Sequence, residues 1–322
     1  IDLNYLNSEK NIDWKIINTS SEIKAQELED FDALILLGHR FTKNSVPKRK
    51  RLSIIARFGV GYDSVDLEAC NSNSIALVIT PDGIRRPVAV SVIAFILSLT
   101  GNLLIKDKII RNGEWNKRSE YMGKGIVNKT LGFLGFGNIG AEVVKLAKAF
   151  DMNFIAHDPY IDKSKAENLG VKIVDIDTVF SQSDVLSINC ALTKETKHIV
   201  NREKLSLMKK SSYLINTSRG PVVDQRALYD ILSSNKIAGA GLDVFEKEPP
   251  DLNDKILSLE NVILSPHSLC WTDQMFNRCG KDDIDAVISV MKGEIPKNIV
   301  NKEIINDKLW REKLKSFEKK YK

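Results

Sequence analysis

Hydrophobic and polar residues alternate in blocks along the chain, and these blocks predict a series of strands and helices. The apolar blocks are short and continuous, as in strands buried on both faces of a parallel sheet. They cover 14–18, 33–38, 52–59 and 75–81 in the first part of the chain, and 130–135, 154–158, 171–175, 184–190, 212–217, 239–244 and 261–266 in the second part. Helix-compatible polar segments separate most of them, which predicts an α/β fold with parallel sheets.

Helical patterns complete this organisation. They cover 139–150 and 225–232 between strands, and 272–292 and 307–322 at the C-terminal end, where we expect the helices to return to the first sheet. A chain of 322 residues is long enough for two domains with separate cores.

A glycine-rich turn follows the strand predicted at 130–135. Gly135, Gly137 and Gly140 form the pattern GxGxxG between a strand and a helix, which lets the backbone approach a dinucleotide pyrophosphate at the helix start. The next strand ends at Asp158, 18 residues beyond Gly140, where a carboxylate accepts hydrogen bonds from a ribose and repels a 2′-phosphate. The pattern therefore predicts NAD in preference to NADP, the alternative being a structural glycine turn with an incidental aspartate.

Residues 88–105 carry no charge over 18 positions, the length at which a membrane helix has to be considered. A helix that is apolar all round also occurs in the interior or at an interface of a large soluble protein. Because a nucleotide-binding pattern follows directly, we expect a buried or subunit-interface helix and no membrane association.

Three polar residues each follow a strand-like run: Arg219, Glu248 and His267. The carboxyl ends of parallel strands meet at one edge of a sheet, where ligands bind. A guanidinium suits a carboxylate, and an imidazole suits proton transfer near neutral pH. The sequence therefore predicts a site that holds a carboxylate and moves a proton, with Glu248 fixing the imidazole tautomer.

Other interpretations of these residues stay open. Arg219 could form a structural ion pair, and Glu248 could be an exposed loop charge, with Glu246 as a competitor for its place. The remaining histidines are interpreted as a loop residue, His39, and as structural residues, His157 and His198.

The composition of the chain argues against some classes of function. The net charge of +5 is modest and dispersed, which does not indicate nucleic-acid binding. Cys70, Cys190, Cys270 and Cys279 show no metal-binding spacing, so we expect no metal site and a reduced, cytoplasmic protein. The N-terminal segment lacks the apolar core of a signal peptide.

Several motifs together resemble the D-isomer-specific 2-hydroxyacid dehydrogenase family. They occur in the family's order over nearly the whole chain and read RFGVGYDSVD, GFGNIG, NTSRGPVVD, GAGLDVFEKEPP and SPH. The resemblance implies NAD-linked interconversion of a small anionic 2-oxo acid and a D-2-hydroxy acid, as in glyoxylate and hydroxypyruvate reductases and phosphoglycerate dehydrogenase-like enzymes.

The resemblance also implies roles for individual residues. Arg219 would bind the substrate carboxylate, His267 would exchange the proton with the carbonyl oxygen, and Glu248 would orient His267. Further implied contacts are those of Val60 and Gly61 with the substrate carboxylate, of Asn138 and Ile139 with the pyrophosphate, and of Thr217 and Asp243 with the nicotinamide.

The architecture implied by the family is a Rossmann-type NAD domain inserted into a flavodoxin-like substrate domain. We expect the NAD domain at 84–269 and the substrate domain at 1–83 and 270–322, with a homodimer formed through a long apolar helix at 88–110.

Two departures from the family pattern concern the substrate. Trp271 stands where relatives have small residues, and either reshapes the pocket wall or packs at the domain hinge. The long helix begins with Val88-Ala89-Val90-Ser91 where relatives often have Ala-Val-Ala-Glu, so a polar contact of the glutamate is missing. Arg85 and Arg86 stand just before this run, and either favour a substrate with a second anionic group or pair across a dimer.

Two rival functions remain on the same scaffold. One is a formate- or phosphite-type dehydrogenase, although Glu248 stands where the formate type commonly has glutamine. The other is an NAD-sensing corepressor or scaffold without turnover, which the complete Arg219, Glu248 and His267 set disfavours.

Overall fold

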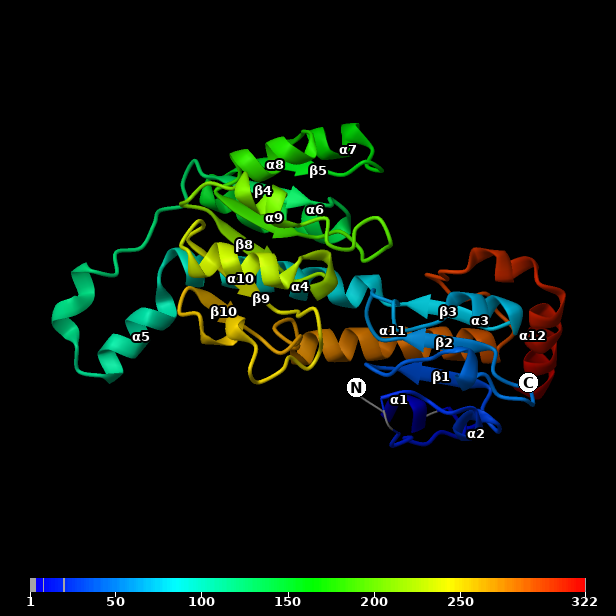
Figure 1. Cartoon of the computed structure of the whole chain (residues 1–322). Helices are drawn as coiled ribbons and strands as arrows, with labels where there is room; N and C mark the ends of the chain where they lie inside the picture. Colours follow the sequence, from blue (N-terminus) through cyan, green and yellow to red (C-terminus); the bar gives the residue numbers. More distant parts are fainter. Residues whose placement is uncertain (1–3, 8, 20, 322) are drawn as a thin grey trace. The chain divides into compact units, whose positions relative to one another are not determined.

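The computed structural model describes residues 4–7, 9–19 and 21–321, and the chain divides into two compact units (Figure 1). Unit 1 consists of Ile1–Ile84 and Trp271–Lys322, and unit 2 is the continuous stretch Arg85–Cys270. Unit 2 is therefore inserted into the sequence of unit 1, with boundaries one residue away from the expected 84 and 269.

Unit 1 is built on a parallel sheet in the order β1-β2-β3. Helices from both ends of its sequence surround the sheet, and Trp310 is fully buried with its Nε1 donating to the Ser53 carbonyl at 2.9 Å. The elements are α1 (Asn4–Asn7), α2 (Ala25–Leu28), β1 (Ala33–Leu36), β2 (Ile54–Arg57), α3 (Leu67–Ser72), β3 (Ala76–Ile79), α11 (Asp273–Met291) and α12 (Lys308–Tyr321). The C-terminal helices thus return to the first sheet, as expected.

The strand expected at 14–18 does not form. Residues 12–19 have no regular secondary structure, and Trp14 and Ile16 are 37% and 71% exposed. A strand is stabilised by a neighbouring strand and a buried face, and this apolar run has neither. The expectation was wrong for that reason.

Unit 2 contains a seven-stranded parallel sheet in the order β10-β9-β8-β7-β4-β5-β6. Its strands are β4 (Thr130–Leu134), β5 (Asn153–His157), β6 (Val171–Ile173), β7 (Val185–Ile188), β8 (Tyr213–Asn216), β9 (Gly239–Leu242) and β10 (Val262–Leu264). The strands β5 and β6 follow on one side of β4, and β7 to β10 then follow on the other side. The carboxyl ends of β4 and β7 therefore form the switch point at which such sheets bind ligands.

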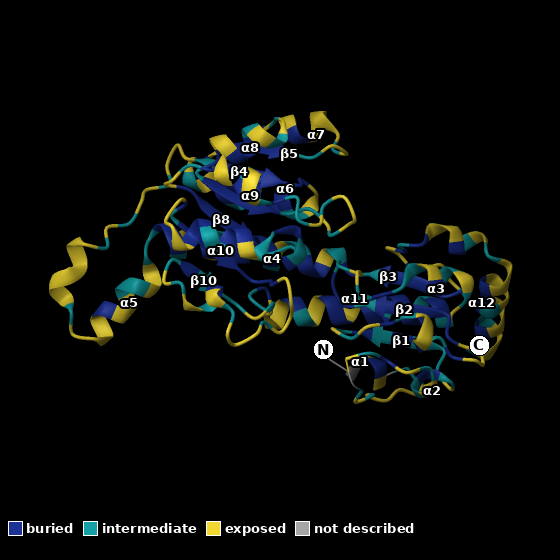
Figure 2. Ribbon diagram, in the orientation of Figure 1, coloured by how far each residue is buried: buried dark blue, intermediate teal, exposed yellow. Residues whose placement is uncertain are grey.

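Helices cover both faces of this sheet, and Figure 2 shows the buried strands between them. Two hydrophobic clusters fill the two sides: α4 and α6 contribute to one, and α8, α9 and α10 to the other. The bounds are α4 (Pro81–Thr100), α6 (Asn138–Ala147), α7 (Lys163–Asn168), α8 (Ile176–Gln182), α9 (Arg202–Ser206) and α10 (Gln225–Ser233).

The single long helix expected at 88–110 is two helices. The first, α4, begins earlier at Pro81, a residue suited to the first turn. It ends at Thr100, and α5 (Leu103–Arg111) follows after Asn102, whose φ of 55° is left-handed. Asparagine tolerates this conformation better than most residues, which permits the break.

The helix α4 is long and apolar enough to cross a membrane by length and composition. However, 56% of its most hydrophobic window is buried inside the protein. Its side chains Val92, Phe95 and Ile96 belong to the core beneath the sheet of unit 2. The apolar character of α4 is thus explained in large part by packing on that sheet.

One buried group in unit 1 has an unusual environment. The Asp283 carboxyl, on α11, is fully buried, and among the described residues neither of its oxygens has a hydrogen-bond partner. Burial raises the pKa of this carboxyl well above its ordinary value; Arg57 opposes the rise and Asp282 adds to it. A neutral carboxyl is therefore the favoured form in the fold.

We expect Asp283→Asn to be more stable than the wild type, by an amount that grows with pH. The aspartate side chain ionises at about pH 3.9 in the unfolded chain, whereas the buried Asp283 keeps its proton to higher pH. In that window the folded chain binds more protons, so the free energy of unfolding of the wild type falls as pH rises. The variant has no ionisable group at this position and so escapes this pH-dependent loss.

Thermal unfolding at about pH 5, 7 and 9 measures this difference. A variant that is less stable than the wild type at all three values would show that the attraction between Asp283 and Arg57 outweighs the cost of burial.

Candidate active site

The glycine turn lies between β4 and α6, at the switch point of the sheet. Gly135 has a φ of 82°, and a Cβ on it would lie 2.6 Å from the Cys190 nitrogen. Gly137 precedes α6 without a side-chain cap and faces open space. The first N–H groups of α6, from Asn138, Ile139 and Gly140, have no acceptor within the helix, as an anion-binding helix start requires.

Asp158 follows β5 and binds the glycine loop directly. Its Oδ2 accepts from Phe136 N at 2.8 Å, and its Oδ1 accepts from Tyr160 N at 2.9 Å. Since each carboxylate oxygen can accept a second hydrogen bond, the side chain can hold the loop and still receive ribose hydroxyls.

We expect Asp158→Ala to weaken NADH binding by about 10- to 100-fold, the worth of a charged hydrogen bond. NADPH should lose less, because the repulsion of its 2′-phosphate also disappears. Fluorescence titration with both cofactors measures the ratio. Asp162→Ala is the matched control, since Asp162 caps α7 nearby through Ser164; an equal effect of both variants would contradict a specific ribose contact.

Two further polar atoms at this edge are buried and have no hydrogen-bond partner in the part of the chain that the structure describes. They are Thr217 Oγ1, after β8, and Asn189 Oδ1, after β7. Buried polar atoms are rarely left unsatisfied, so these two fit the polar edges of a bound dinucleotide. Thr217 was expected here, and Asn189 was missed although it closes the strand run 184–190.

Asp243, which is expected to contact the nicotinamide, also accepts hydrogen bonds from the protein backbone. Asp243 is buried, and its Oδ1 accepts from Ser268 N at 3.0 Å and from Leu269 N at 3.1 Å. This oxygen therefore supports the backbone that directly follows His267.

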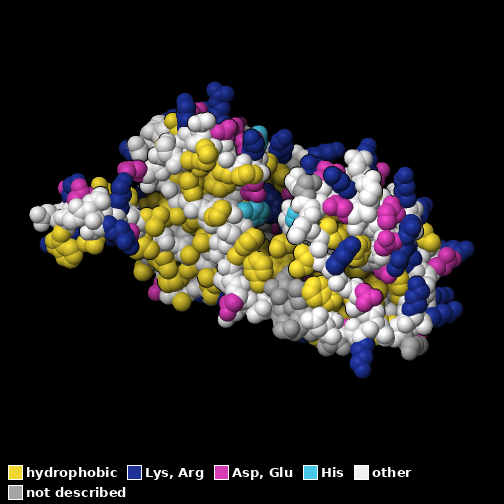
Figure 3. Space-filling view, turned by 90° about the horizontal axis from the view of Figure 1, so that it is seen from below, with side chains coloured by type: hydrophobic (Ala, Val, Ile, Leu, Met, Phe, Trp, Pro, Cys, Tyr) yellow, Lys and Arg dark blue, Asp and Glu magenta, His cyan; other side chains and the backbone are white. Residues whose placement is uncertain are grey.

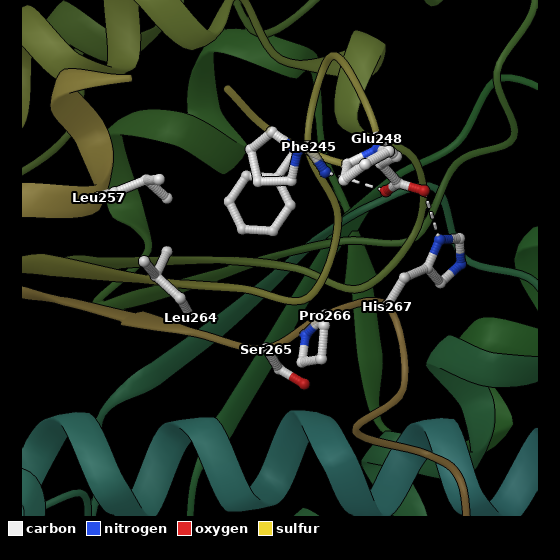
Figure 4. Close-up of a pocket in the computed structure, with 9 residues that line it drawn as sticks. Phe245, Glu248, Leu257, Leu264, Ser265, Pro266 and His267 are labelled. Carbon is white, nitrogen blue, oxygen red and sulfur yellow. Dashed lines mark hydrogen bonds and ion pairs between the residues drawn. The ribbon is translucent and has the colours of Figure 1, made fainter. Parts of the chain in front are cut away.

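His267 and Glu248 form the centre of the site (Figure 4). His267 Nδ1 lies 2.8 Å from Glu248 Oε2, and Phe245 N donates to Glu248 Oε1 at 3.0 Å. Partial burial opposes ionisation of Glu248, but His267, Phe245 N–H and the charge of Arg219 outweigh it and hold the pKa of this carboxyl below its ordinary value. An ionised Glu248 favours a proton on Nδ1 and leaves Nε2 for proton exchange.

Arg219 follows β8 with an extended backbone, and its Nη1 donates to the Ser218 carbonyl at 2.7 Å. The next residue, Gly220, packs against the backbone of Phe245 and Glu246, where a Cβ would lie 1.8 Å from the Phe245 carbonyl oxygen. This contact joins the segments that carry Arg219 and Glu248. The three expected catalytic side chains thus lie in unit 2, on neighbouring segments.

Val60 and Gly61 lie in unit 1, in the loop that follows β2. The preceding Gly59 has a φ of 106°, and its N–H donates to Thr80 Oγ1 at 2.7 Å. This bond and the return bond from Thr80 N to the Gly59 carbonyl, 2.9 Å, fix the start of the loop.

The other histidines have protein partners. The Nδ1 atoms of His39 and His157 lie 2.9 Å and 3.1 Å from the carbonyls of Leu37 and Val174. His198 Nε2 lies 2.6 Å from Glu246 Oε1. Among the described residues no cluster of histidine, cysteine and carboxylate side chains could hold a metal ion.

The two departures from the family pattern also have defined neighbours. Arg86 Nε pairs within unit 2 with the buried Glu142 at 3.1 Å, and Lys145 Nζ shares this carboxylate at 3.3 Å. Trp271 remains half exposed and packs edge-on against Phe276, with ring centroids 5.2 Å apart.

A pocket of about 430 Å³ lies beside the histidine–glutamate pair. Its walls are mainly apolar, and Figure 4 shows Phe245, Leu257 and Leu264 on the side away from the free edge of the imidazole. The pocket therefore does not lie at His267 Nε2, the nitrogen left for proton exchange, but on the opposite side of the histidine–glutamate pair.

Comparisons with known proteins show the family to which the chain belongs. The family model described as D-isomer specific 2-hydroxyacid dehydrogenase, NAD binding domain, matches residues 93–268, more than half of the chain. Glyoxylate reductase of Thermococcus litoralis is 37% identical over 288 residues, covering 87% of this chain and 86% of the relative. D-lactate dehydrogenase of Aquifex aeolicus, solved with NAD and lactic acid, has a TM-score of 0.83 at 31% identity and covers 93% of this chain and 96% of its own.

D-3-phosphoglycerate dehydrogenase of Methanocaldococcus jannaschii is 38% identical over 278 residues, which cover 86% of this chain but 53% of the relative. The chain thus spans about half the length of the phosphoglycerate dehydrogenases that it matches. The matched family model and the relatives of similar length establish that the chain belongs to the D-isomer specific 2-hydroxyacid dehydrogenase family of NAD-dependent oxidoreductases.

Proposed function

We propose that this protein reduces a small 2-oxo acid to the D-2-hydroxy acid with NADH and catalyses the reverse reaction with NAD. The observation that carries the proposal is the bond of 2.8 Å between His267 and an ionised Glu248, on segments adjoining that of Arg219. Bound NADH supplies the hydride to the substrate C2.

The side chains supply binding and the proton. The Arg219 guanidinium binds the substrate carboxylate, which places the carbonyl oxygen within reach of His267. His267 Nε2 donates its proton to that oxygen as negative charge develops, and takes it back in the oxidation direction. Glu248 stabilises the imidazolium and fixes the ring.

The remaining expected contacts complete the proposal. The backbone of Val60 and Gly61 receives the substrate carboxylate, and Thr217 and Asp243 line the nicotinamide pocket. Glyoxylate and hydroxypyruvate are the first substrates to consider, because relatives of similar length carry the names glyoxylate reductase and hydroxypyruvate reductase.

The test follows NADH absorbance with glyoxylate, hydroxypyruvate, pyruvate, 3-phosphohydroxypyruvate and 2-oxoglutarate. We expect turnover with at least one small 2-oxo acid, and loss of that turnover in His267→Ala. Tight NADH binding without turnover of any of them would reject the proposal in favour of an NAD-sensing protein.

A homodimer is part of the same proposal. Residues 101–128 contain α5 and form an arm that projects from unit 2 (Figure 1) and returns to its core at Ile126. Hydrophobic side chains gather on the surface of unit 2 in Figure 3. Large exposed apolar patches are typical of surfaces that bind another protein. The exposed apolar residues of α4 and the arm are Val90, Leu97, Leu103, Leu104, Ile110, Trp115, Met122 and Val127.

Light scattering after gel filtration tests this proposal. The wild type is expected at twice the mass of the chain, and Leu103→Glu with Leu104→Glu at the mass of one chain. Tyr160→Glu, at a residue that is 93% exposed and outside the arm, serves as the control. A monomeric wild type would contradict the proposal.

A further inference from the structure

The segment 189–198, between β7 and α9, contacts three parts of the site in unit 2. At its start, the Cys190 backbone packs against Gly135 of the cofactor loop. At its end, His198 N donates to the Pro221 carbonyl at 2.9 Å, two residues after Arg219. The His198 side chain reaches a third segment, with its Nε2 2.6 Å from Glu246 Oε1.

Glu246 is held from the other side as well. Its N–H donates to Gln225 Oε1 at 2.9 Å, and its Oε2 accepts from Gln225 N at 3.4 Å, at the start of α10. Gln225 Nε2 in turn donates to Asp254 Oδ2 at 2.6 Å. Glu246 is thus fixed between His198 and α10.

This position matters for the catalytic pair because Glu246 and Glu248 share one turn. Phe245 N–H donates to the Glu248 carboxylate, and Gly220 packs on the Phe245 carbonyl and on Glu246 N, where a Cβ would lie 2.4 Å away. A displacement of Glu246 would therefore move both the donor to Glu248 and the backbone next to Arg219.

The backbone conformation of His198 indicates that the surrounding structure holds this residue in position. Its φ is 54°, a left-handed conformation that costs free energy in a non-glycine residue and persists where the surroundings impose it. Both His198 and Glu246 are more than a third exposed, so the hydrogen bond between their side chains adds little to stability. A role in global stability does not account for this arrangement.

We propose that His198 and Glu246 form a clamp that sets the spacing between Arg219 and Glu248, and so aligns the carboxylate-binding and proton-transferring groups. Both are positioning residues, because neither belongs to the set that would meet the substrate. The inference rests on the proposed function of that set.

Kinetics of single and double variants test the clamp. We expect His198→Ala and Glu246→Ala each to lower kcat for 2-oxo acid reduction about tenfold, the order of loss that small misplacements cause. The double variant should lose no more than either single variant, and His198→Gln should regain activity because its amide can still donate to Glu246. The affinity for NADH should stay within about twofold, because the glycine loop is held independently by Asp158.

Arg202→Ala is the matched control. It removes the ion pair between Arg202 and Asp230, which is also exposed and joins α9 to α10 in the same unit. Among the described residues neither side chain of this pair is hydrogen-bonded to the turn that carries Glu248, so kcat should remain at the wild-type value.

Hydrogen–deuterium exchange of the cofactor-free protein gives a readout that needs no turnover. In the clamp variants, amides in 218–224 and 243–250 should exchange about tenfold faster, whereas Arg202→Ala should leave them unchanged. Unchanged exchange and unchanged kcat would overturn the clamp, and so would faster exchange at unchanged kcat in an active enzyme. Faster exchange in a protein that turns over no 2-oxo acid would support the clamp while rejecting the proposed function.

Discussion

The His267→Asn variant is expected to reduce its 2-oxo acid about 10²- to 10⁴-fold more slowly than the wild type, the usual contribution of a general acid. Asparagine is polar and of similar reach, but it cannot release a proton near neutral pH. The carbonyl oxygen would then take its proton from water, at a site where the Glu248 carboxylate no longer has an imidazolium to stabilise. Steady-state kcat at saturating NADH measures this loss.

Two controls make the result specific to His267. NADH binding should stay within about twofold, since the cofactor contacts lie on other segments. His157→Asn should retain kcat, because that ring contacts the Val174 carbonyl. A His267→Asn enzyme within tenfold of the wild type would exclude His267 as the proton donor.

The second large effect is expected for Arg219. Arg219→Ala should lower kcat/KM for the 2-oxo acid by about 10²- to 10³-fold, since two charge-assisted hydrogen bonds to a carboxylate are lost. Arg219→Lys should recover part of this loss, because an ammonium keeps the charge but not the paired geometry. Competition by oxalate or another small dicarboxylate should weaken in parallel with the rise in KM.

A substrate without a carboxylate provides the control for this prediction. Reduction of glyoxal, however slow, should be nearly insensitive to Arg219→Ala, because glyoxal offers the guanidinium no anionic partner. An equal loss for glyoxal and glyoxylate would indicate a general disruption of the site, including the nearby Glu248.

The strands of both units could be predicted closely from the sequence, since buried parallel strands read as continuous apolar runs. The same rule failed at 14–18, because an apolar run does not reveal whether a neighbouring strand exists. The break at Asn102 was also missed, since Leu103 and Leu104 continue the apolar character of α4 past the point where the helix ends.

The residues of the site also divide into those that could be predicted from the sequence and those that could not. Arg219, Glu248 and His267 could be singled out because each ends a recognisable strand run. His198 could not, because its partner Glu246 is 48 residues away and neither lies at a strand end. Long-range pairs between loops have no local signature, so they emerge only when the fold brings the loops together.

The bond from Phe136 N to Asp158 has a consequence for how the cofactor is received. This bond orders the glycine loop during folding. NADH binding therefore does not include the entropic cost of ordering the loop. Calorimetry of NADH binding should accordingly show a small unfavourable entropy, and proteases should spare this loop even in the free protein. The cofactor loop would then keep its bound conformation when the supply of dinucleotide falls, ready to bind NADH again without refolding.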